Sequence, residues 1–197
     1  MNYKNLFHAL LTCILFTGLA FTTTKDSSVF KVDVAKSAIN WKGYKVAGSQ
    51  QGTLNLKVGE LNFEDDDLTG GYFEIDMTSI YCTDDISKKM KAKLEKHLKS
   101  ADFFGVEKYP TSKFVITKVA SRGTPGDYKI TGDLTIKETT KEIKFNAHLE
   151  ENTATAKITI DRSDFNVRYG SGSFFGNLGD KTIYDEFDLD VNLIVTK

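Results

Sequence analysis

The chain has 197 residues, with 26 lysines and arginines against 27 aspartates and glutamates, so its formal net charge is −1 at pH 7. This near balance argues against a nucleic-acid partner, which requires a concentrated basic face, and against a strongly anionic membrane surface. The length is that of a single domain that can bury a sizeable core without disulfides or a metal ion.

The N-terminal segment differs from the rest of the chain and is typical of a secretory signal peptide. Lys4 is followed by an apolar run over 10–21, which is too short to span a bilayer comfortably. Small residues over 18–20 predict cleavage near Ala20, or as late as about residue 24, which would leave a periplasmic or secreted domain over 25–197. Cys13 raises the possibility of a lipoprotein, but Thr12 precedes it, and we expect no lipid anchor.

From Val29 onwards, apolar and polar residues alternate, as they do in strands with one buried face and one solvated face. Glu64-Asp65-Asp66-Asp67 interrupts this pattern. The run lacks the alternating ligands and central glycine of a calcium loop, so we interpret it as a solvated hairpin end. The alternating segments in this part of the chain are 30–34, 39–42, 54–63 and 73–77.

One helix is predicted, over about 84–99. Thr83 or Asp84 is a suitable N-cap, and Asp85 would place a negative charge at the positive end of the helix dipole. One apolar stripe is expected to lie against the β-structure. It recurs every fourth residue and consists of Ile86, Met90, Leu94 and Leu98.

The helical pattern ends at two adjacent aromatic residues. Phe103 and Phe104 stand next to Gly105 and shortly before Pro110, so the helix has stopped and two large rings must be buried by another element. We expect these rings to pin the helix to the β-structure, or to lie where a ligand enters it.

Alternation then resumes and continues to the C-terminus. A loop over 170–180 is rich in glycine and serine yet carries Phe174 and Phe175, which form either an entrance flap over a cavity or rings folded back on the core. Eight or slightly more antiparallel strands close most economically into a barrel, which either is filled or holds one small ligand. The predicted strands of this half are 114–117, 128–136, 143–149, 154–160, 165–169 and 187–195.

Patterns of catalytic and metal-binding residues are missing from the sequence. It has no Gly-x-Ser-x-Gly, His-Glu-x-x-His, Walker or Cys-x-x-Cys motif. His97 and His148 cannot form a metal site by themselves, and we interpret His97 as a boundary residue bonded to the backbone. Asp161 and Arg162 are interpreted as an ion pair at a strand end. Cys82, the one cysteine that remains after signal cleavage, is interpreted as a small buried hydrophobic residue. Because none of these residues forms a catalytic or metal-binding pattern, we predict that the protein is not an enzyme and has no cofactor or metal ion.

Several motifs extend over nearly the whole mature chain. They are Ile39-Asn-Trp, Gly71-Tyr-Phe-Glu-Ile-Asp-Met, the run from Leu94 to Phe104, Lys108-Tyr-Pro, Phe114, Gly132-Asp-Leu-Thr-Ile-Lys, Thr140-Lys and Ile160-Asp-Arg. Together they closely resemble the YceI-like family of bacterial periplasmic proteins. The turn Glu138-Thr-Thr-Lys departs from the family's Gly-Val-Thr-Lys, and the stretch 158–185 looks like the subgroup found in Bacteroidetes-type genomes.

The resemblance implies an all-β, lipocalin-like, eight-stranded antiparallel barrel with one inserted helix. Its hydrophobic tunnel would hold a polyisoprenoid such as an isoprenoid quinone, with no catalytic residues and with a homodimer in some members. The leading hypothesis is therefore a protein that binds an isoprenoid lipid. Its expected lining residues are Trp41, Phe73, Ile75, Phe114, Ile116, Ile130, Leu134 and Phe145, with Phe103, Phe104, Phe174 and Phe175 near the entrance.

Two other hypotheses remain open at this point. The first is a filled barrel that acts as a non-enzymatic stress-response or protein-interaction module, for which a solid interior and an exposed apolar patch would be the signs. The second is an enzyme that acts on an isoprenoid in the tunnel. It would need a polar pair inside the cavity, for which His97 and His148 are the histidine candidates.

Overall fold

The computed structural model describes residues 25–196, so the expected signal peptide and Cys13 lie outside the described residues. Within that range the chain forms nine strands, one α-helix, α1 (Lys88–Lys99), and two short 3-10 helices, η1 (Arg162–Phe165) and η2 (Gly179–Lys181). The strands are β1 (Ser27–Val32), β2 (Ala38–Lys45), β3 (Gly48–Glu64), β4 (Asp67–Cys82), β5 (Thr111–Ser121), β6 (Asp127–Ile136), β7 (Thr139–Glu150), β8 (Thr153–Asp161) and β9 (Ile183–Thr196).

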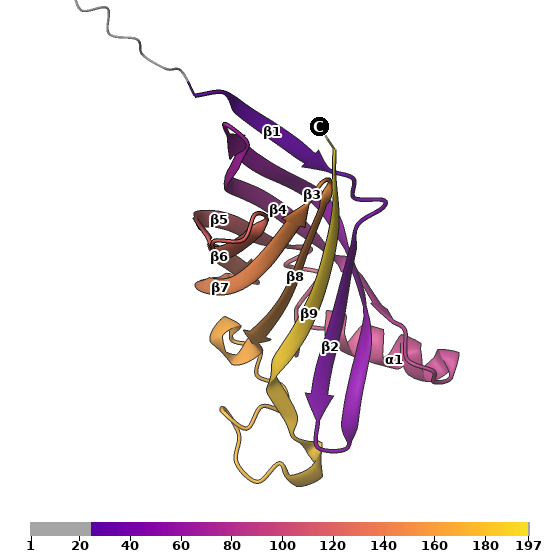
Figure 1. Ribbon diagram of the computed structural model, residues 1–197. Helices are drawn as coiled ribbons and strands as arrows, with labels where there is room; N and C mark the ends of the chain where they lie inside the picture. Colours follow the sequence, from indigo (N-terminus) through magenta and orange to yellow (C-terminus); the bar gives the residue numbers. More distant parts are fainter. Residues whose placement is uncertain (1–24, 197) are drawn as a thin grey trace, which may run out of the picture.

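Eight of these strands, β2 to β9, close into an antiparallel barrel (Figure 1). The order around the barrel is β3-β2-β9-β8-β7-β6-β5-β4, and pairing of β4 with β3 completes the circle. The ninth strand, β1, pairs with the end of β3 and with the end of β9. The predicted eight-stranded antiparallel barrel with one inserted helix is therefore confirmed.

Side chains alternate between the barrel interior and its surface, as the sequence pattern predicted. Ile130 and Leu134 of β6 are 2% and 7% exposed. Aromatic rings pack against one another on the inner wall, with centroids 6.3 Å apart for the cross-strand neighbours Phe73 and Phe114 and 5.5 Å apart for Phe114 and Phe145. The inward faces of the strands thus supply most of the core.

The acidic run forms the turn of the β3–β4 hairpin, where Asp65 and Asp66 have φ values of 49° and 70°. Both central residues of a type I′ turn need positive φ, which aspartate tolerates better than most residues. The interpretation of this run as a hairpin end is confirmed. The predicted β6–β7 hairpin also forms, with Lys137 in its turn at φ 58°.

The predicted strand over 165–169 does not form, because η1 takes the place of its first residue. The Asp161 carboxylate caps η1 by accepting a hydrogen bond from the Ser163 amide at 2.8 Å, which turns the chain away from the strand ladder. Phe165 and Val167 are nevertheless 1% and 0% exposed. The alternating apolar residues at 165 and 167 are therefore buried, as predicted, but they belong to a turn and not to a strand.

The helix α1 begins later than the sequence predicted. Its N-cap is Ser87, whose hydroxyl oxygen accepts a hydrogen bond from the Met90 amide at 3.4 Å, so neither Thr83 nor Asp84 caps it. The Asp84 carboxylate instead accepts the Gln51 amide of β3 at 3.2 Å. The predicted helix start near residue 84 is wrong, because the Asp84 side chain is bonded to β3 and does not cap the helix.

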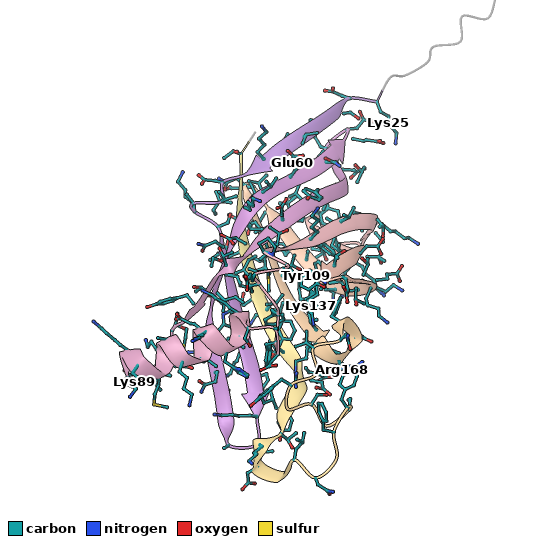
Figure 2. The ribbon with its side chains drawn as sticks, turned by 180° about the vertical axis from the view of Figure 1, so that it is seen from behind. Lys25, Glu60, Lys89, Tyr109, Lys137 and Arg168 are labelled. Carbon is teal, nitrogen blue, oxygen red and sulfur yellow. The ribbon has the colours of Figure 1, made fainter. Side chains whose placement is uncertain are left out.

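The predicted apolar stripe of the helix is used only in part. Ile86 precedes the helix and Met90 is 59% exposed, whereas Leu94 and Leu98 line the barrel cavity. Figure 2 shows α1 reaching away from the barrel with Lys89 near its outer end. The C-terminal half of the helix is therefore the part that docks.

Replacing Ser87 with alanine is expected to destabilise α1 by about 1 kcal/mol, because the side-chain cap is lost. Since the outer half of the helix is exposed, the effect should appear mainly as faster amide hydrogen exchange over 88–99. Thr83→Ala is the matched control and should leave that exchange unchanged. Equal acceleration in both variants would contradict Ser87 as the N-cap.

Candidate functional site

The barrel encloses a continuous cavity of about 360 Å³. All eight barrel strands contribute to its wall, together with the C-terminal half of α1 and the segment that follows the helix. The wall is mostly aliphatic and aromatic, which is the composition that favours apolar ligands. Representative aliphatic members from four different strands are Leu56, Ile75, Ile130 and Leu189.

The structure places the residues that the sequence analysis selected for the lining on the cavity wall. Phe103 and Phe104, predicted near the entrance, also line it. Alternation was sufficient to find these residues because a barrel turns every inward-facing position toward the same interior. The selected lining residues on the wall are Trp41, Phe73, Ile75, Phe114, Ile116, Ile130, Leu134 and Phe145.

Phe174 and Phe175 are placed differently. They are 38% and 49% exposed, and neither is among the residues that line the cavity. The Arg168 guanidinium lies 4.8 Å from the centre of the Phe174 ring. The rings are thus not folded into the core, and a role of this loop at an entrance stays a prediction.

One end of the cavity carries polar side chains from the β2–β3 hairpin and the start of β9. Lys45, Gln50 and Tyr184 line it there, beside Tyr44. The Tyr44 hydroxyl donates a hydrogen bond to the Asp188 carboxylate at 2.7 Å. This bond raises the pKa of Tyr44 and lowers the pKa of Asp188. A mostly apolar tunnel with this group of polar side chains at its end suits an amphipathic molecule.

His97 does not make the backbone hydrogen bond that the sequence analysis expected. Its Nε2 is buried without a hydrogen-bond partner among the described residues, and the same is true of Nε1 of Trp41. The imidazole instead lies edge-on to aromatic rings, 4.3 Å from Tyr169 and 5.7 Å from Phe103 between centroids. The expectation is wrong because the preferred partner of the ring is an aromatic loop distant in the sequence.

His148 lies at the other end of the barrel from His97. It is close to the β7–β8 turn, and its Nδ1 is 2.7 Å from the Asp127 carboxylate. His97 is on α1, which follows the C-terminal end of β4, at the end of the barrel away from the β7–β8 turn. The two histidines therefore do not form the polar pair that an enzymatic reaction in the tunnel would need.

A buried ion pair at the base of the barrel was missed by the sequence analysis. The Arg162 guanidinium is within 3.1 Å of the Asp185 carboxylate, and its donors also bind the carbonyl oxygens of Tyr184, Val167 and Ile183. The Arg162 side chain is 3% exposed and the Asp185 side chain 15%. The predicted pairing of Arg162 with its neighbour in the sequence is wrong, because that neighbour caps η1.

Burial and hydrogen bonding act in opposite directions on this ion pair. Burial alone would raise the pKa of Asp185, but the hydroxyls of Ser173 and Ser171 and the charge of Arg162 together hold it below its usual value. Burial lowers the pKa of the Arg162 guanidinium, and the attraction of Asp185 opposes this. Both groups are charged at neutral pH, and the pair fastens the start of β9 to η1.

Phe103 connects the helix to this ion pair. The ring is 6% exposed and lies 5.3 Å from the Arg162 guanidinium carbon and 5.1 Å from the Phe104 ring. Phe104 is half-buried and also touches the smaller cluster formed by Met77, Ile80 and Val106. Both rings thus lie between the end of the helix and the barrel core, and their role as a pin stays a prediction.

Other reactive side chains give little sign of a site. Cys82 is 0% exposed, and burial raises the pKa of its thiol, as expected for a structural cysteine. Within residues 25–196, no three or more histidine, cysteine, aspartate or glutamate side chains gather as metal ligands would. No helix of the described part of the chain is long and apolar enough to cross a membrane.

Comparison with known proteins adds sequence relatives and similar folds. Residues 30–195 match the family model described as YceI-like domain. A UPF0312 protein of Shewanella denitrificans is 30% identical over 145 residues, which are 71% of either chain. A UPF0312 protein of Photorhabdus laumondii is 47% identical over 58 residues, 29% of either chain. These relatives give no support to the expected Bacteroidetes-type subgroup.

Two solved structures share the fold. BcnA of Burkholderia cenocepacia has a TM-score of 0.67 at 24% identity, over 84% of this chain and 99% of that one. A polyisoprenoid-binding domain of Saccharophagus degradans has a TM-score of 0.58 at 13% identity, over 85% of this chain and 97% of that one. At these identities the likeness concerns the barrel architecture.

Proposed function

The chain belongs to the YceI-like domain family, and on that premise we propose that it binds an isoprenoid lipid, a polyisoprenoid or an isoprenoid quinone, inside the barrel. The bound lipid would be transported, stored or protected in the cell envelope, to which the expected signal peptide would deliver the protein. We infer no enzymatic activity, since the cavity histidines lie at opposite ends. A homodimer is part of the proposal, and sedimentation analysis tests it.

The continuous apolar cavity is the observation that supports this proposal. Residues from all eight strands face one interior volume of about 360 Å³. Burying an apolar chain there yields about 0.8 kcal/mol per methylene, so binding needs no strong polar contact. The rival hypothesis of a filled barrel required a solid interior, and the cavity therefore weighs against it.

The polar end of the cavity suggests how an amphipathic lipid would be oriented. Lys45 and Gln50 line that end, where the β2–β3 hairpin meets β9, and Tyr184 lies beside them. A polar headgroup placed there would keep its hydration or exchange it for these side chains, while the chain occupies the apolar interior. The proposed orientation is thus headgroup toward the β2–β3 hairpin.

Replacing Gly43 with phenylalanine is expected to reduce lipid binding by about ten-fold or more, because the ring would occupy volume that the ligand needs. Gly43 lines the cavity, and a side-chain carbon built on it meets no atom within 4 Å, so the fold should tolerate the ring. Binding of cis-parinaric acid, a fluorescent polyene fatty acid, is measured through energy transfer from Trp41, the single tryptophan of the chain.

The matched control for this obstruction is Gly172→Phe. Gly172 also has open space around it but lies outside the cavity lining, so binding should stay at the wild-type level. Native mass spectrometry of protein from its own host then identifies the lipid itself. A clean ligand-free mass, together with no uptake of a quinone or polyprenol, would count decisively against the proposed function.

A further inference from the structure

The barrel wall has a section between β7 and β8 in which the two strands do not pair. The two strands pair only next to their turn, from Ala147 with Ala156 to Glu150 with Thr153. Residues 139–146 of β7 and 157–161 of β8 run on without pairing to each other, and Figure 1 shows the strands spreading apart below their shared hairpin. We call this unpaired section between 139–146 and 157–161 the β7–β8 window.

The seams on either side of the window are fully paired. All of β6 pairs with β7, and all of β8 pairs with β9. The window is therefore a local feature of one seam. Its lower end is bridged by η1, which packs against β7 and carries the exposed Lys141–Asp164 ion pair at 3.9 Å. The window is thus framed above by the hairpin and below by η1.

The cavity reaches this window. Ile143 and Phe145 line the cavity from one lip and Ile158 from the other, and all three are half-buried. His148 and Thr155 also border the cavity, although they alternate outward on the hairpin and are exposed. These two residues face each other in the paired hairpin directly above the window, so the cavity comes near the outer face of the wall at the upper edge of the window.

The neighbouring strands β4 and β5 also separate before their ends, but among the described residues no cavity border is found on the outer face there. Pairing of β4 with β5 ends at Gly71 and Ile116. The outward-facing neighbours Thr69 and Thr117 are not among the residues that border the cavity. Of the two divergent seams, the β7–β8 seam is therefore the one with outward-facing side chains that border the cavity, and these lie at the upper edge of the window.

We propose that the β7–β8 window is a lateral portal through which the apolar chain of the ligand enters and leaves the barrel. This inference rests on the proposed function, that the cavity holds a chain-like lipid. Passage through a paired seam would break strand hydrogen bonds, whereas the window has none to break. The apolar side chains on both sides of the window, Ile143, Phe145 and Ile158, would also shield the lipid chain from water while it moves inward.

The window is tested by closing it with a disulfide. If the ladder continued past its last pair, Asn146 would face Lys157, and both are exposed and lie outside the lining. The variant Asn146→Cys/Lys157→Cys therefore places two cysteines at the first unpaired position of the window, next to the last ladder pair, where a disulfide would join β7 to β8. Cys82 does not compete, because its thiol is fully buried.

Loading of cis-parinaric acid and its release to lipid vesicles are followed by stopped-flow fluorescence. Oxidation is expected to slow both rates by about ten-fold or more while the equilibrium affinity stays nearly constant, since a gate changes rates and leaves the site intact. Reduction should restore both rates. If the disulfide does not form, a short bismaleimide linker joins the same cysteines for the same comparison.

The matched control shares one cysteine and moves the other to the paired seam. Asn146→Cys/Lys129→Cys joins residues that already face each other in the β6–β7 ladder, so its oxidation should not change either rate. Unchanged rates in the window variant, or equal slowing in both variants, would overturn the portal. Absence of binding in the wild-type protein would instead remove the proposed function, and the portal with it.

Discussion

Substituting Asp185 with asparagine is expected to lower the free energy of unfolding by about 3 kcal/mol or more, because the Arg162 charge would remain buried without its counter-charge. The Arg162 side chain is only 3% exposed and cannot regain water without opening η1. Asparagine keeps the shape of the side chain, so the loss reports the charge. Urea denaturation followed by Trp41 fluorescence measures it.

The pH dependence of this effect has a definite direction. The folded-state pKa of Asp185 is lowered, so its contribution to stability is fully present above the unfolded value of about 3.9 and is lost as the pH falls through the folded value. The stability difference between wild type and Asp185→Asn should therefore be constant near neutral pH and shrink below about pH 4.

Asp190→Asn is the matched control on the same strand. Asp190 pairs with Lys157 at 4.0 Å, and these side chains are 60% and 88% exposed. Such a pair contributes less than about 1 kcal/mol. Comparable losses for the Asp185 and Asp190 variants would contradict the assignment of the Arg162–Asp185 pair as the anchor that holds the start of β9 to η1.

Replacing Phe103 with alanine is expected to cost about 3–5 kcal/mol of stability, the range for a fully buried aromatic ring. The ring is 6% exposed and touches the helix end, Arg162 and Phe104. Its removal leaves a void between α1 and the barrel. Phe104→Ala should cost clearly less, because Phe104 is half-buried and part of its contact is with the open cavity.

The same two variants separate a pinning role from a role in ligand entry. Loss of stability with cis-parinaric acid binding intact indicates the pin, which is the expected result for Phe103→Ala. Loss of binding in a stable protein indicates a contact with the ligand, which is the expected result for Phe104→Ala. Phe175→Ala serves as the surface control and should change stability by no more than about 0.5 kcal/mol. A stable Phe103→Ala protein would contradict the pin.

The sequence by itself determined the strands and their inward faces. Alternation has a period of two residues and depends only on neighbours in the chain, so it identified Phe73, Ile75, Phe114 and Ile130 as interior positions before any strand was paired. A closed antiparallel sheet then brings all such positions into one cavity. The turn at Asp65 and Asp66 was equally local.

Only the tertiary structure decided which distant groups meet. Arg162 could have paired with its neighbour Asp161, but Asp161 caps η1, and the partner of Arg162 is Asp185 on the strand that returns after the loop. Asp84 could have capped α1, but β3 engages it. The hydrogen-bond and ion-pair partners of these side chains depend on how the loops fold back. The local pattern of apolar and polar residues does not predict this.

The β7–β8 window is also a tertiary feature. The sequences of β7 and β8 alternate without interruption through 143–149 and 154–160, so nothing in the pattern predicts where their pairing stops. Pairing stops above η1, which follows β8 directly, packs against β7 and contains Arg162 of the buried Arg162–Asp185 pair. The sequence determined the apolar wall, whereas the place where strand pairing in that wall stops depends on how distant segments pack, which only the tertiary structure shows.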